Sequence, residues 1–280
     1  MANVFLRFPG GKSKVLTFSY DDGVQQDIRL IEIFRKHGMK GTFNLNGGRF
    51  APEGTVFPKG RFHRRLTAQE AKDAYPEDVC EVACHSYTHP HLTGFQASAP
   101  VAIEILEDRK ALEAMFAKPI HGMAYPFGPT NDMVVDVLKM CDIYYARTTV
   151  STEKFDMPTD WLRLPATCHH KNPRLMELAS TFLAAAPVTH PMMFYVWGHA
   201  YEFEEQDNWQ VIEDFCDKMA NKDDIWYATN MEIYNAWSDY MRLETSADGK
   251  MIHNPSARSV WVAQQNKAPF EIQPGQTACL

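Results

Sequence analysis

Two short motifs in this sequence combine residue types that hold metal ions in proteins. The first places two adjacent acids, Asp21 and Asp22, before Gly23, and the second separates His85 from His89 by three residues. Side chains four residues apart lie on one side of a helical turn. Two neutral imidazoles and one carboxylate make a three-ligand set for Zn²⁺ that leaves a position for water. The other carboxylate is then free to act as a general base.

Each motif has a simpler interpretation when it is considered alone. An Asp-Gly pair is typical of a turn that exposes its acids to solvent, and a histidine pair can lie at the surface near a helix cap. The positions of the motifs favour chemistry instead. Apolar runs at residues 14–20 and 78–84 predict strands that end at the two motifs, and parallel α/β folds collect their active sites at the carboxyl ends of strands.

The order of the expected elements predicts an α/β fold. Strands are predicted at residues 14–20, 40–45, 78–84, 123–125, 143–147, 191–197 and 225–229. Helices are predicted at residues 26–37, 100–116, 132–141 and 209–222. Alternating strands and helices favour a parallel sheet, and such a sheet must be covered on both faces, so a barrel is a natural closure.

Two stretches interrupt the alternation. Residues 47–67 are rich in Gly, Pro and Arg and predict a long surface loop. The tail contains strand patterns at residues 259–263 and 270–272, which predict a small β appendage rather than a second large domain. We therefore expect a barrel over residues 1–242 and an appendage over residues 243–280 that packs on the barrel.

Composition and charge exclude some classes of function. The chain has 280 residues, 45% of them hydrophobic, and a formal net charge of −7. This acidic balance argues against binding to a nucleic-acid backbone, and no apolar stretch has the length of a membrane span. The amino terminus has no signal-peptide pattern, and the six cysteines are scattered. Both observations lead us to expect a cytoplasmic protein.

Several motifs resemble those of the polysaccharide deacetylases, carbohydrate esterase family 4. Ser19-Tyr20-Asp21-Asp22-Gly23 is similar to the family's Thr-Phe-Asp-Asp-Gly motif, and His85-Ser86-Tyr87-Thr88-His89 matches its His-Ser/Thr-x-x-His motif in full. Ala124-Tyr125-Pro126-Phe127-Gly128 is similar to its Arg-x-Pro-Tyr/Phe-Gly motif, and Trp197-Gly198-His199 stands where the family has a late Leu-x-His motif. Residues 40–44 look like its second strand.

This resemblance implies a fold, a cofactor and a set of roles. The fold would be a distorted (β/α) barrel of about seven strands. One divalent metal ion, Zn²⁺ or else Co²⁺, Ni²⁺ or Mn²⁺, would be held by Asp22, His85 and His89. The general base would be Asp21 and the general acid His199, and the backbone N–H of Phe127 would stabilise the oxyanion.

One departure from the family concerns the general base. The family has an arginine that pairs with this carboxylate and orients it, but this chain has Ala124 at that position. The loss should alter the pKa and the geometry of Asp21. Either another cation substitutes, for which Arg147 and Arg163 are candidates, or the activity is weak or directed at an unusual substrate.

Aromatic residues near the predicted strand ends could form a wall on which a sugar stacks. The candidates are Tyr125, Phe127, Trp161, Trp197 and Tyr201. Ordinary core positions are an equally good interpretation of these residues. His170 could line the same cleft. The run Cys168-His169-His170 could also suggest a second metal site, but the family needs none there, so we favour a polar loop.

The sequence therefore predicts a metal-dependent hydrolase that removes N- or O-acetyl groups from an oligo- or polysaccharide. Two alternatives stay open. One is an amidohydrolase of the same fold that acts on a small non-sugar amide, and the other is a glycan-binding protein with weak catalysis, which the substitution at Ala124 would favour. No nucleic-acid or membrane partner is expected, and a homo-oligomer is left open.

Overall fold

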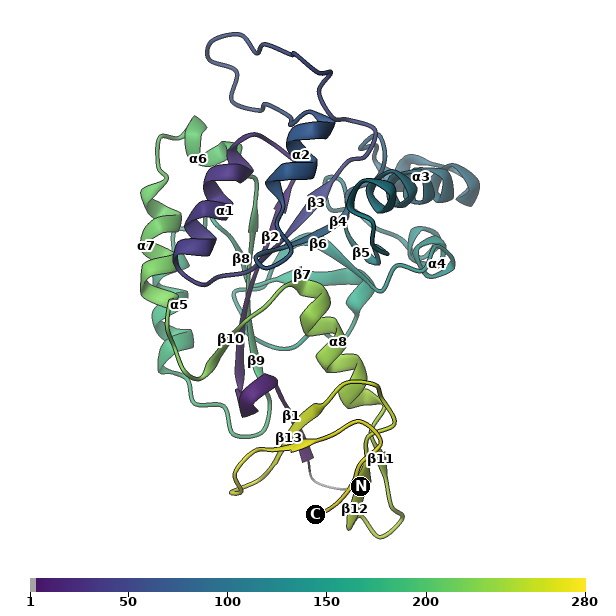
Figure 1. Cartoon of the computed structure of the whole chain (residues 1–280), viewed down its shortest axis with the longest axis vertical. Helices are drawn as coiled ribbons and strands as arrows, with labels where there is room; N and C mark the ends of the chain where they lie inside the picture. Colours follow the sequence, from purple (N-terminus) through teal and green to yellow (C-terminus); the bar gives the residue numbers. More distant parts are fainter. Residues whose placement is uncertain (1–3) are drawn as a thin grey trace.

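A curled parallel sheet forms the centre of the computed structural model, which describes residues 4–280 (Figure 1). Its nine strands are β2 Lys14–Asp21, β3 Gly41–Leu45, β4 Cys80–Cys84, β5 Gly122–Ala124, β6 Tyr145–Ser151, β7 Leu164–Ala166, β8 Cys168–His169, β9 Met192–Gly198 and β10 Ile225–Tyr227. All eight residues of β2 are buried, as expected for a parallel strand that is covered on both faces.

The two ends of the sheet meet each other. The hydrogen-bonded order is β7-β6-β5-β4-β3-β2-β9-β8, with β10 paired to the beginning of β2. The outermost strands, β7 and β8, are separated in the chain only by Thr167, whose N–H donates to the carbonyl of Tyr195 in β9 (2.9 Å). If β7 and β8 are counted as one interrupted strand, and β10, which pairs only with β2, is set aside, seven strands form the curled sheet. The predicted distorted (β/α) barrel of about seven strands is confirmed.

Helices surround this sheet on its outer side (Figure 1). They are α1 Gln26–Lys36, α2 Ala68–Ala74, α3 Ser98–Phe116, α4 Asp132–Met140, α5 Leu175–Ala184, α6 Tyr201–Glu205, α7 Gln210–Met219 and α8 Asn230–Met241. Helix α1 ends as its sequence predicts, because Gly38 follows it with a φ of 66°, and a left-handed glycine is a common helix stop. Three short 3₁₀ turns, at Pro9–Gly11, Leu92–Gly94 and Trp161–Arg163, join other elements.

The β appendage lies at one end of the molecule and includes both ends of the described chain. Strand β1 Val4–Arg7 pairs with β13 Val260–Gln264, which pairs with β14 Phe270–Ile272. A second small sheet joins β11 Glu244–Thr245, β12 Met251–His253 and β15 Thr277–Cys279. Strand β1, which lies within the range expected for the barrel, therefore belongs to the sheet of the appendage.

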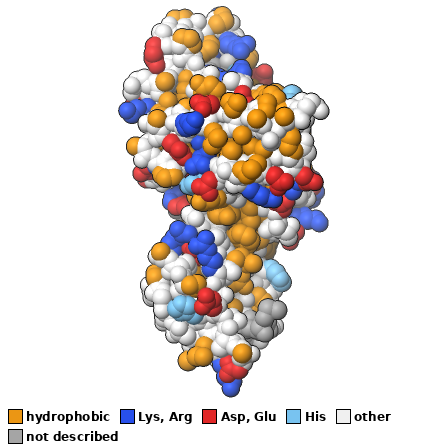
Figure 2. All heavy atoms as spheres, turned by 90° about the vertical axis from the view of Figure 1, so that its right-hand side faces the viewer, with side chains coloured by type: hydrophobic (Ala, Val, Ile, Leu, Met, Phe, Trp, Pro, Cys, Tyr) orange, Lys and Arg blue, Asp and Glu red, His pale blue; other side chains and the backbone are white. Residues whose placement is uncertain are grey.

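Contacts with α8 and β1 hold the appendage on the barrel. Arg258 forms an ion pair with the buried Asp239 of α8 (2.6 Å), and the hydroxyl of Tyr240 donates to the carbonyl of Val4 (2.9 Å). Figure 2 shows a narrow waist between the larger body and the appendage. Among residues 4–280, no helix is both long enough and apolar enough to cross a bilayer.

Candidate metal centre and active site

The three predicted metal ligands come together at the carboxyl ends of β2 and β4. Ligand atoms of Asp22, His85 and His89 all lie within 4.8 Å of one another. The two Nε2 atoms of the histidines are 3.2 Å apart, and the Nε2 of His89 is 3.8 Å from Oδ1 of Asp22. Asp22 and His85 are buried, and His89 is half-buried.

The protonation of the two imidazoles fits a metal centre. Nδ1 of His85 lies 2.8 Å from the carbonyl oxygen of Ala124, so it carries the ring proton and leaves the lone pair on Nε2. Burial lowers the pKa of His85, and burial together with the neighbouring His85 lowers the pKa of His89 to about 4. Both rings are therefore neutral at pH 7. Two neutral nitrogens and an ionised carboxylate suit a divalent cation of the zinc type.

Strained backbone marks this corner of the molecule. Asp22, Ser86, His89 and Phe127 have φ values of 85°, 61°, 61° and 62°. Left-handed conformations in non-glycine residues cost about 1–3 kcal/mol each and persist only where the surroundings impose them. Four of the ten non-glycine residues with positive φ among residues 4–280 lie in the two metal motifs and the expected oxyanion loop, so the surroundings must hold the backbone of this site in place.

Buried polar groups hold the strained segment after β4. The amide nitrogen of Asn46 donates to the carbonyls of His85 (2.5 Å) and Ser86 (2.7 Å). The carboxylate of Asp108, on α3, accepts from the N–H groups of His85 (2.8 Å) and Gly47 (2.5 Å). Because buried backbone groups need such partners, these contacts fix the position of the histidine motif relative to β3 and α3.

Asp21, the expected general base, is buried beside the three ligands. Its Oδ1 accepts hydrogen bonds from Asn44 (2.8 Å) and from the guanidinium of Arg147 (2.5 Å), which also contacts Oδ2. Burial alone would raise the pKa of Asp21, but the guanidinium of Arg147, through its charge and its hydrogen bonds, holds it below its usual value. The carboxylate is therefore ionised at neutral pH.

Arg147 supplies the cation that the sequence lacks at Ala124. Ala124 of β5 and Arg147 of β6 are paired neighbours in the parallel sheet. The guanidinium therefore reaches the same carboxylate from the next strand along. Arg147 is completely buried, and the ring of Trp197 lies 4.6 Å from its guanidinium carbon. This arrangement favours a cation–π contact in addition to the ion pair.

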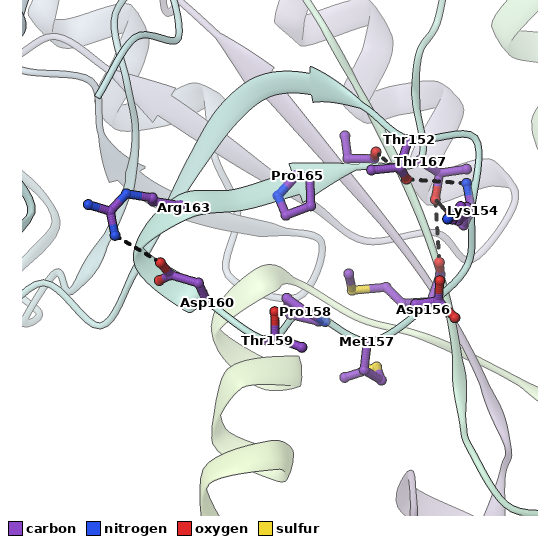
Figure 3. A pocket seen from close by; sticks show the side chains of 12 residues that line it. Thr152, Lys154, Asp156, Met157, Pro158, Thr159, Asp160, Arg163, Pro165 and Thr167 are labelled. Atoms are coloured by element: carbon purple, nitrogen blue, oxygen red, sulfur yellow. Dashed lines mark hydrogen bonds and ion pairs between the residues drawn. The ribbon is translucent and has the colours of Figure 1, made fainter. Parts of the chain in front are cut away.

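The other candidate for this role, Arg163, lies elsewhere. It pairs with Asp160 (3.0 Å) and Asp132 (2.5 Å). Figure 3 shows Arg163 directed at Asp160 on the rim of a cavity of about 340 Å³, whose other labelled residues include Lys154 and Asp156. None of the three metal ligands lines this cavity.

The long loop after β3 contributes two residues that the sequence analysis missed. Arg65 donates to Oδ1 of Asp22 (2.8 Å) and to its carbonyl oxygen (2.5 Å), and His63 lies 3.0 Å from Oδ2. These contacts keep the pKa of Asp22 far below its usual value, although burial opposes them. The basic run from Arg61 to Arg65 was the only sequence signal.

His199, the expected general acid, lies between two carboxylates. Its Nε2 is 3.9 Å from Oδ2 of Asp21, and its Nδ1 is 3.4 Å from Oε2 of Glu202 on α6. Burial alone would lower the pKa of His199, but Glu202 and the nearby aspartates raise it above its usual value. The side chain is 24% exposed, so it can reach a bound molecule.

Phe127 presents both a backbone donor and an exposed ring. No described group accepts a hydrogen bond from its N–H, which leaves the donor free for an oxyanion. The ring is 53% exposed, stacks on His91 with centroids 3.9 Å apart, and touches the edge of His89 (4.6 Å). An exposed ring next to a metal ligand can receive the apolar face of a sugar.

The other aromatic residues that were expected to form a sugar-binding wall differ in their burial. Trp197 is buried between Arg147 and His169, whereas Tyr201 is half-exposed beside His63 and His199. Two candidates do not fit the wall. Trp161 is buried against the aromatic rings of α8, and Tyr125 is buried with its hydroxyl bonded to the carbonyl of Leu162 (2.6 Å).

His170 is also less accessible than expected. Only 2% of its surface is exposed, and burial together with the neighbouring His169 lowers its pKa well below the usual value. Its ring stacks on Phe203 and Tyr20. Direct contact with a bound sugar is therefore excluded without movement of the chain.

Comparisons with known proteins identify a similar family and a similar fold. The family model for polysaccharide deacetylases matches residues 9–146. A candidate polysaccharide deacetylase from Mycobacterium smegmatis has the same fold, with a TM-score of 0.57 and 14% identity over 84% of this chain and 93% of that one. No curated protein matches the chain significantly.

Two further solved structures extend the comparison. The carbohydrate esterase 4 domain of a multidomain xylanase from the hindgut metagenome of Trinervitermes trinervoides has a TM-score of 0.50, with 16% identity over 81% of this chain and 92% of that one. The Streptococcus pyogenes deacetylase PplD is 19% identical with a TM-score of 0.41, and the match covers 48% of this chain and 55% of that protein.

Proposed function

Residues 9–146 carry the polysaccharide deacetylase family pattern, and from that premise we propose that this protein removes acetyl groups from a carbohydrate by metal-dependent hydrolysis. The observation that supports catalysis most strongly is the buried Arg147–Asp21 pair beside the metal triad. The absence of arginine at Ala124 had favoured a glycan-binding protein with weak catalysis. Arg147 supports the catalytic alternative, because it hydrogen-bonds Asp21 from the neighbouring strand and favours the ionised carboxylate.

The cofactor of this proposal is one divalent metal ion held by Asp22, His85 and His89. When bound, such an ion polarises the acyl carbonyl and lowers the pKa of a coordinated water. Zinc suits the donor set best, and Co²⁺, Ni²⁺ or Mn²⁺ are alternatives. His63 and Arg65 hold the carboxylate of Asp22 from the side of the loop, as partners behind a metal ligand usually do.

Three groups of the chain would handle the proton and the charge. Asp21 is ionised and accepts the proton of the attacking water. The N–H of Phe127 donates to the oxygen of the acyl group as negative charge develops there. Loss of one such donor typically costs about 10²–10³ in rate. His199, whose raised pKa favours the protonated ring, donates a proton from Nε2 to the departing sugar nitrogen or oxygen.

The substrate of this proposal is an acetylated oligo- or polysaccharide. Phe127 and Tyr201 offer partly exposed rings next to the catalytic groups, one beside His89 and one beside His199. Such rings stack on the apolar faces of pyranose sugars. The structure gives no comparable support for a small linear amide as the substrate.

Acetate release tests this function directly. Purified protein is incubated with N-acetylated chitooligosaccharides and with O-acetylated xylan, with and without a chelator. We expect acetate from at least one substrate, loss of activity with the chelator, and recovery after Zn²⁺ is restored. The Asp21→Asn variant should keep its metal and lose about 10²–10⁴ in rate. Cleavage of small amides only, with no acetate from either carbohydrate, would contradict the proposal.

A further inference from the structure

A second group of metal-ligand residues lies behind His199. Ligand atoms of His169, His170 and Glu202 all lie within 4.8 Å of one another. Nε2 of His169 and Nε2 of His170 are each 3.3 Å from the same oxygen, Oε2 of Glu202. His169 is the last residue of the short strand β8 and His170 follows it, while Glu202 lies on α6 after β9, so neighbouring strand ends deliver the set. None of these residues belongs to the triad.

From this geometry we propose a second divalent-metal site formed by His169, His170 and Glu202. Two imidazoles and one carboxylate are the donors of many zinc sites, and three protein ligands leave one position for water. The proposed occupant is Zn²⁺ or another borderline divalent ion, since the donor set has no thiolate and only one carboxylate.

His170 is the strongest support for a ligand at this place. The ring is 2% exposed, and neither of its nitrogens forms a hydrogen bond with another described residue. Burial of a polar group without a partner is costly. The ring is also fixed, because it stacks on Phe203 and Tyr20. A metal bond at Nε2 would satisfy a nitrogen that is otherwise buried without a hydrogen bond, with only the carboxylate of Glu202 nearby at 3.3 Å.

The backbone opposite the His170 ring leaves space for it at Gly198. A Cβ atom built on Gly198 would lie 2.2 Å from Nδ1 of His170, so any larger residue there would displace the imidazole. Gly198 therefore provides the space in which this ring turns towards Glu202.

Lys171 and His169 complete the local chemistry. The ammonium of Lys171 is 2.6 Å from Oε1 of Glu202, which occupies one carboxylate oxygen and leaves Oε2 facing the histidines. Nδ1 of His169 accepts a hydrogen bond from the N–H of Lys171 (3.1 Å). Metal binding at Nε2 moves the ring proton to Nδ1 and breaks that contact. Lys171 is exposed, so water can take over its N–H.

Occupation of this site has a consequence for the neighbouring active site. His199 faces the same Oε2 of Glu202 through Nδ1 (3.4 Å) and through its own N–H (3.2 Å). A metal ion and a protonated His199 therefore compete for one oxygen. The second ion should inhibit a deacetylase that uses His199 as its acid, and this part of the inference rests on the proposed function.

Metal counting separates the two sites without relying on activity. Metal-free protein is titrated with Zn²⁺ against a chromophoric chelator, and bound zinc is measured after equilibrium dialysis. We expect two equivalents for the wild type and one for the His169→Ala/Glu202→Gln variant. The His85→Ala/His89→Ala variant should also bind one, and the combined variant none. His253→Ala, which alters a histidine of the appendage, is the matched control and should bind two.

The outcomes decide between the proposals. A wild type that binds one equivalent, lost in His85→Ala/His89→Ala, overturns the second site and leaves the first intact. A second equivalent retained in His169→Ala/Glu202→Gln also overturns it. If only His169→Ala/Glu202→Gln loses zinc, the second site stands and the first one fails. Circular dichroism and melting temperature identify misfolded variants, and Glu202→Gln alone, which keeps the side-chain volume, then replaces the double variant.

Discussion

The ion pair between Arg147 and Asp21 is the residue-level feature on which most of the proposed function depends. Both side chains are buried, and the arginine reaches the carboxylate from β6 rather than from β5. A buried ion pair contributes little net stability, but removal of one partner leaves an uncompensated charge. Substitution of one partner or of both should therefore affect activity and stability differently.

The Arg147→Met variant should lose activity and stability together. Without its cation, Asp21 is less ionised and less well oriented, so kcat/KM for acetate release should fall about 10²–10⁴-fold. The unpaired carboxylate should lower the free energy of unfolding by about 3–5 kcal/mol. The Arg147→Met/Asp21→Asn double variant should recover stability but not activity. Arg163→Met, in the separate cavity of Figure 3, serves as the control.

The pH dependence of turnover tests the role of Glu202. Its carboxylate favours the protonated form of His199 and helps to raise the pKa of that ring. Since the acid must be protonated to donate, activity is lost as the pH rises through this pKa. Glu202→Gln removes the negative charge, so the alkaline limb of the kcat profile should move to lower pH. Glu202→Asp should lie between the two, and an alkaline limb that stays in place would contradict this role.

At the scale of elements, the strands were easier to predict than the residues around them. The predicted strands at 14–20, 78–84 and 191–197 correspond to β2, β4 and β9, because buried parallel strands have continuous apolar runs. Helix α5 was missed although its buried residues, Leu175, Leu178, Ala179 and Phe182, have helical spacing. Helix α8 was harder to find, since most of its aromatic residues are only half-buried between barrel and appendage.

In the candidate site, the metal ligands could be predicted from the sequence, but several of the residues that surround them could not. The motifs indicated the ligand set because residue type and spacing suffice for it. They did not distinguish Arg147 from Arg163, since that choice depends on the register of β5 against β6. His63 and Arg65 come from an irregular loop, and no periodicity indicates that such residues reach Asp22. The wall was mispredicted at Trp161 and Tyr125, because an aromatic residue near a strand end fits a core equally well.

Helix α1 carries a carboxyl group whose titration should change stability. Oδ2 of Asp27 accepts from the hydroxyl of Tyr75 (2.6 Å) and from the N–H of Val24 (3.1 Å). Burial raises the pKa of Asp27 to about 7. Between about pH 4 and 7 the folded state therefore holds a proton that the unfolded state has lost, so stability falls as the pH rises through this window.

The Asp27→Asn variant should remove this contribution. Oδ1 of Asp27 has no hydrogen-bond partner among the described residues, so an amide oxygen at Oδ2 can keep both bonds. The slope of unfolding free energy against pH between pH 4.5 and 7 should become less negative by up to about 1.4 kcal/mol per pH unit. Denaturant titrations at several pH values measure it, and an unchanged slope would show that Asp27 is ionised in the folded protein.

At the scale of the whole molecule, the two ends of the chain depend on each other. Strand β1 has its sheet partner in β13, about 250 residues later, and the body and appendage meet at the waist seen in Figure 2. Truncation after Arg242 removes that partner and exposes the edge of β1. We expect a melting temperature lower by several degrees and greater aggregation, because a loss of about 1 kcal/mol shifts it by about 2–4 °C in a chain of this size.

A second truncation separates the effect of the unpaired β1 edge from the effect of losing the appendage. Removal of both β1 and the tail should behave no worse than removal of the tail alone, since no unpaired strand edge remains. An unchanged melting temperature in the chain truncated after Arg242 would show that the appendage packs without stabilising the barrel. The ion pair of Arg258 with Asp239 predicts part of the effect, and Arg258→Ala tests that share in the full-length chain.

The neighbouring placement of Ala124 and Arg147 has a consequence for the evolution of this fold. One carboxylate needs one guanidinium, and either of two adjacent strands can supply it. Positions 124 and 147 should therefore covary among relatives, with arginine at one and a small residue at the other. A lineage can pass between the two arrangements through an intermediate that carries both arginines or neither. Homologues that lack the expected arginine in the β5 motif should be examined at the β6 position before they are classed as inactive.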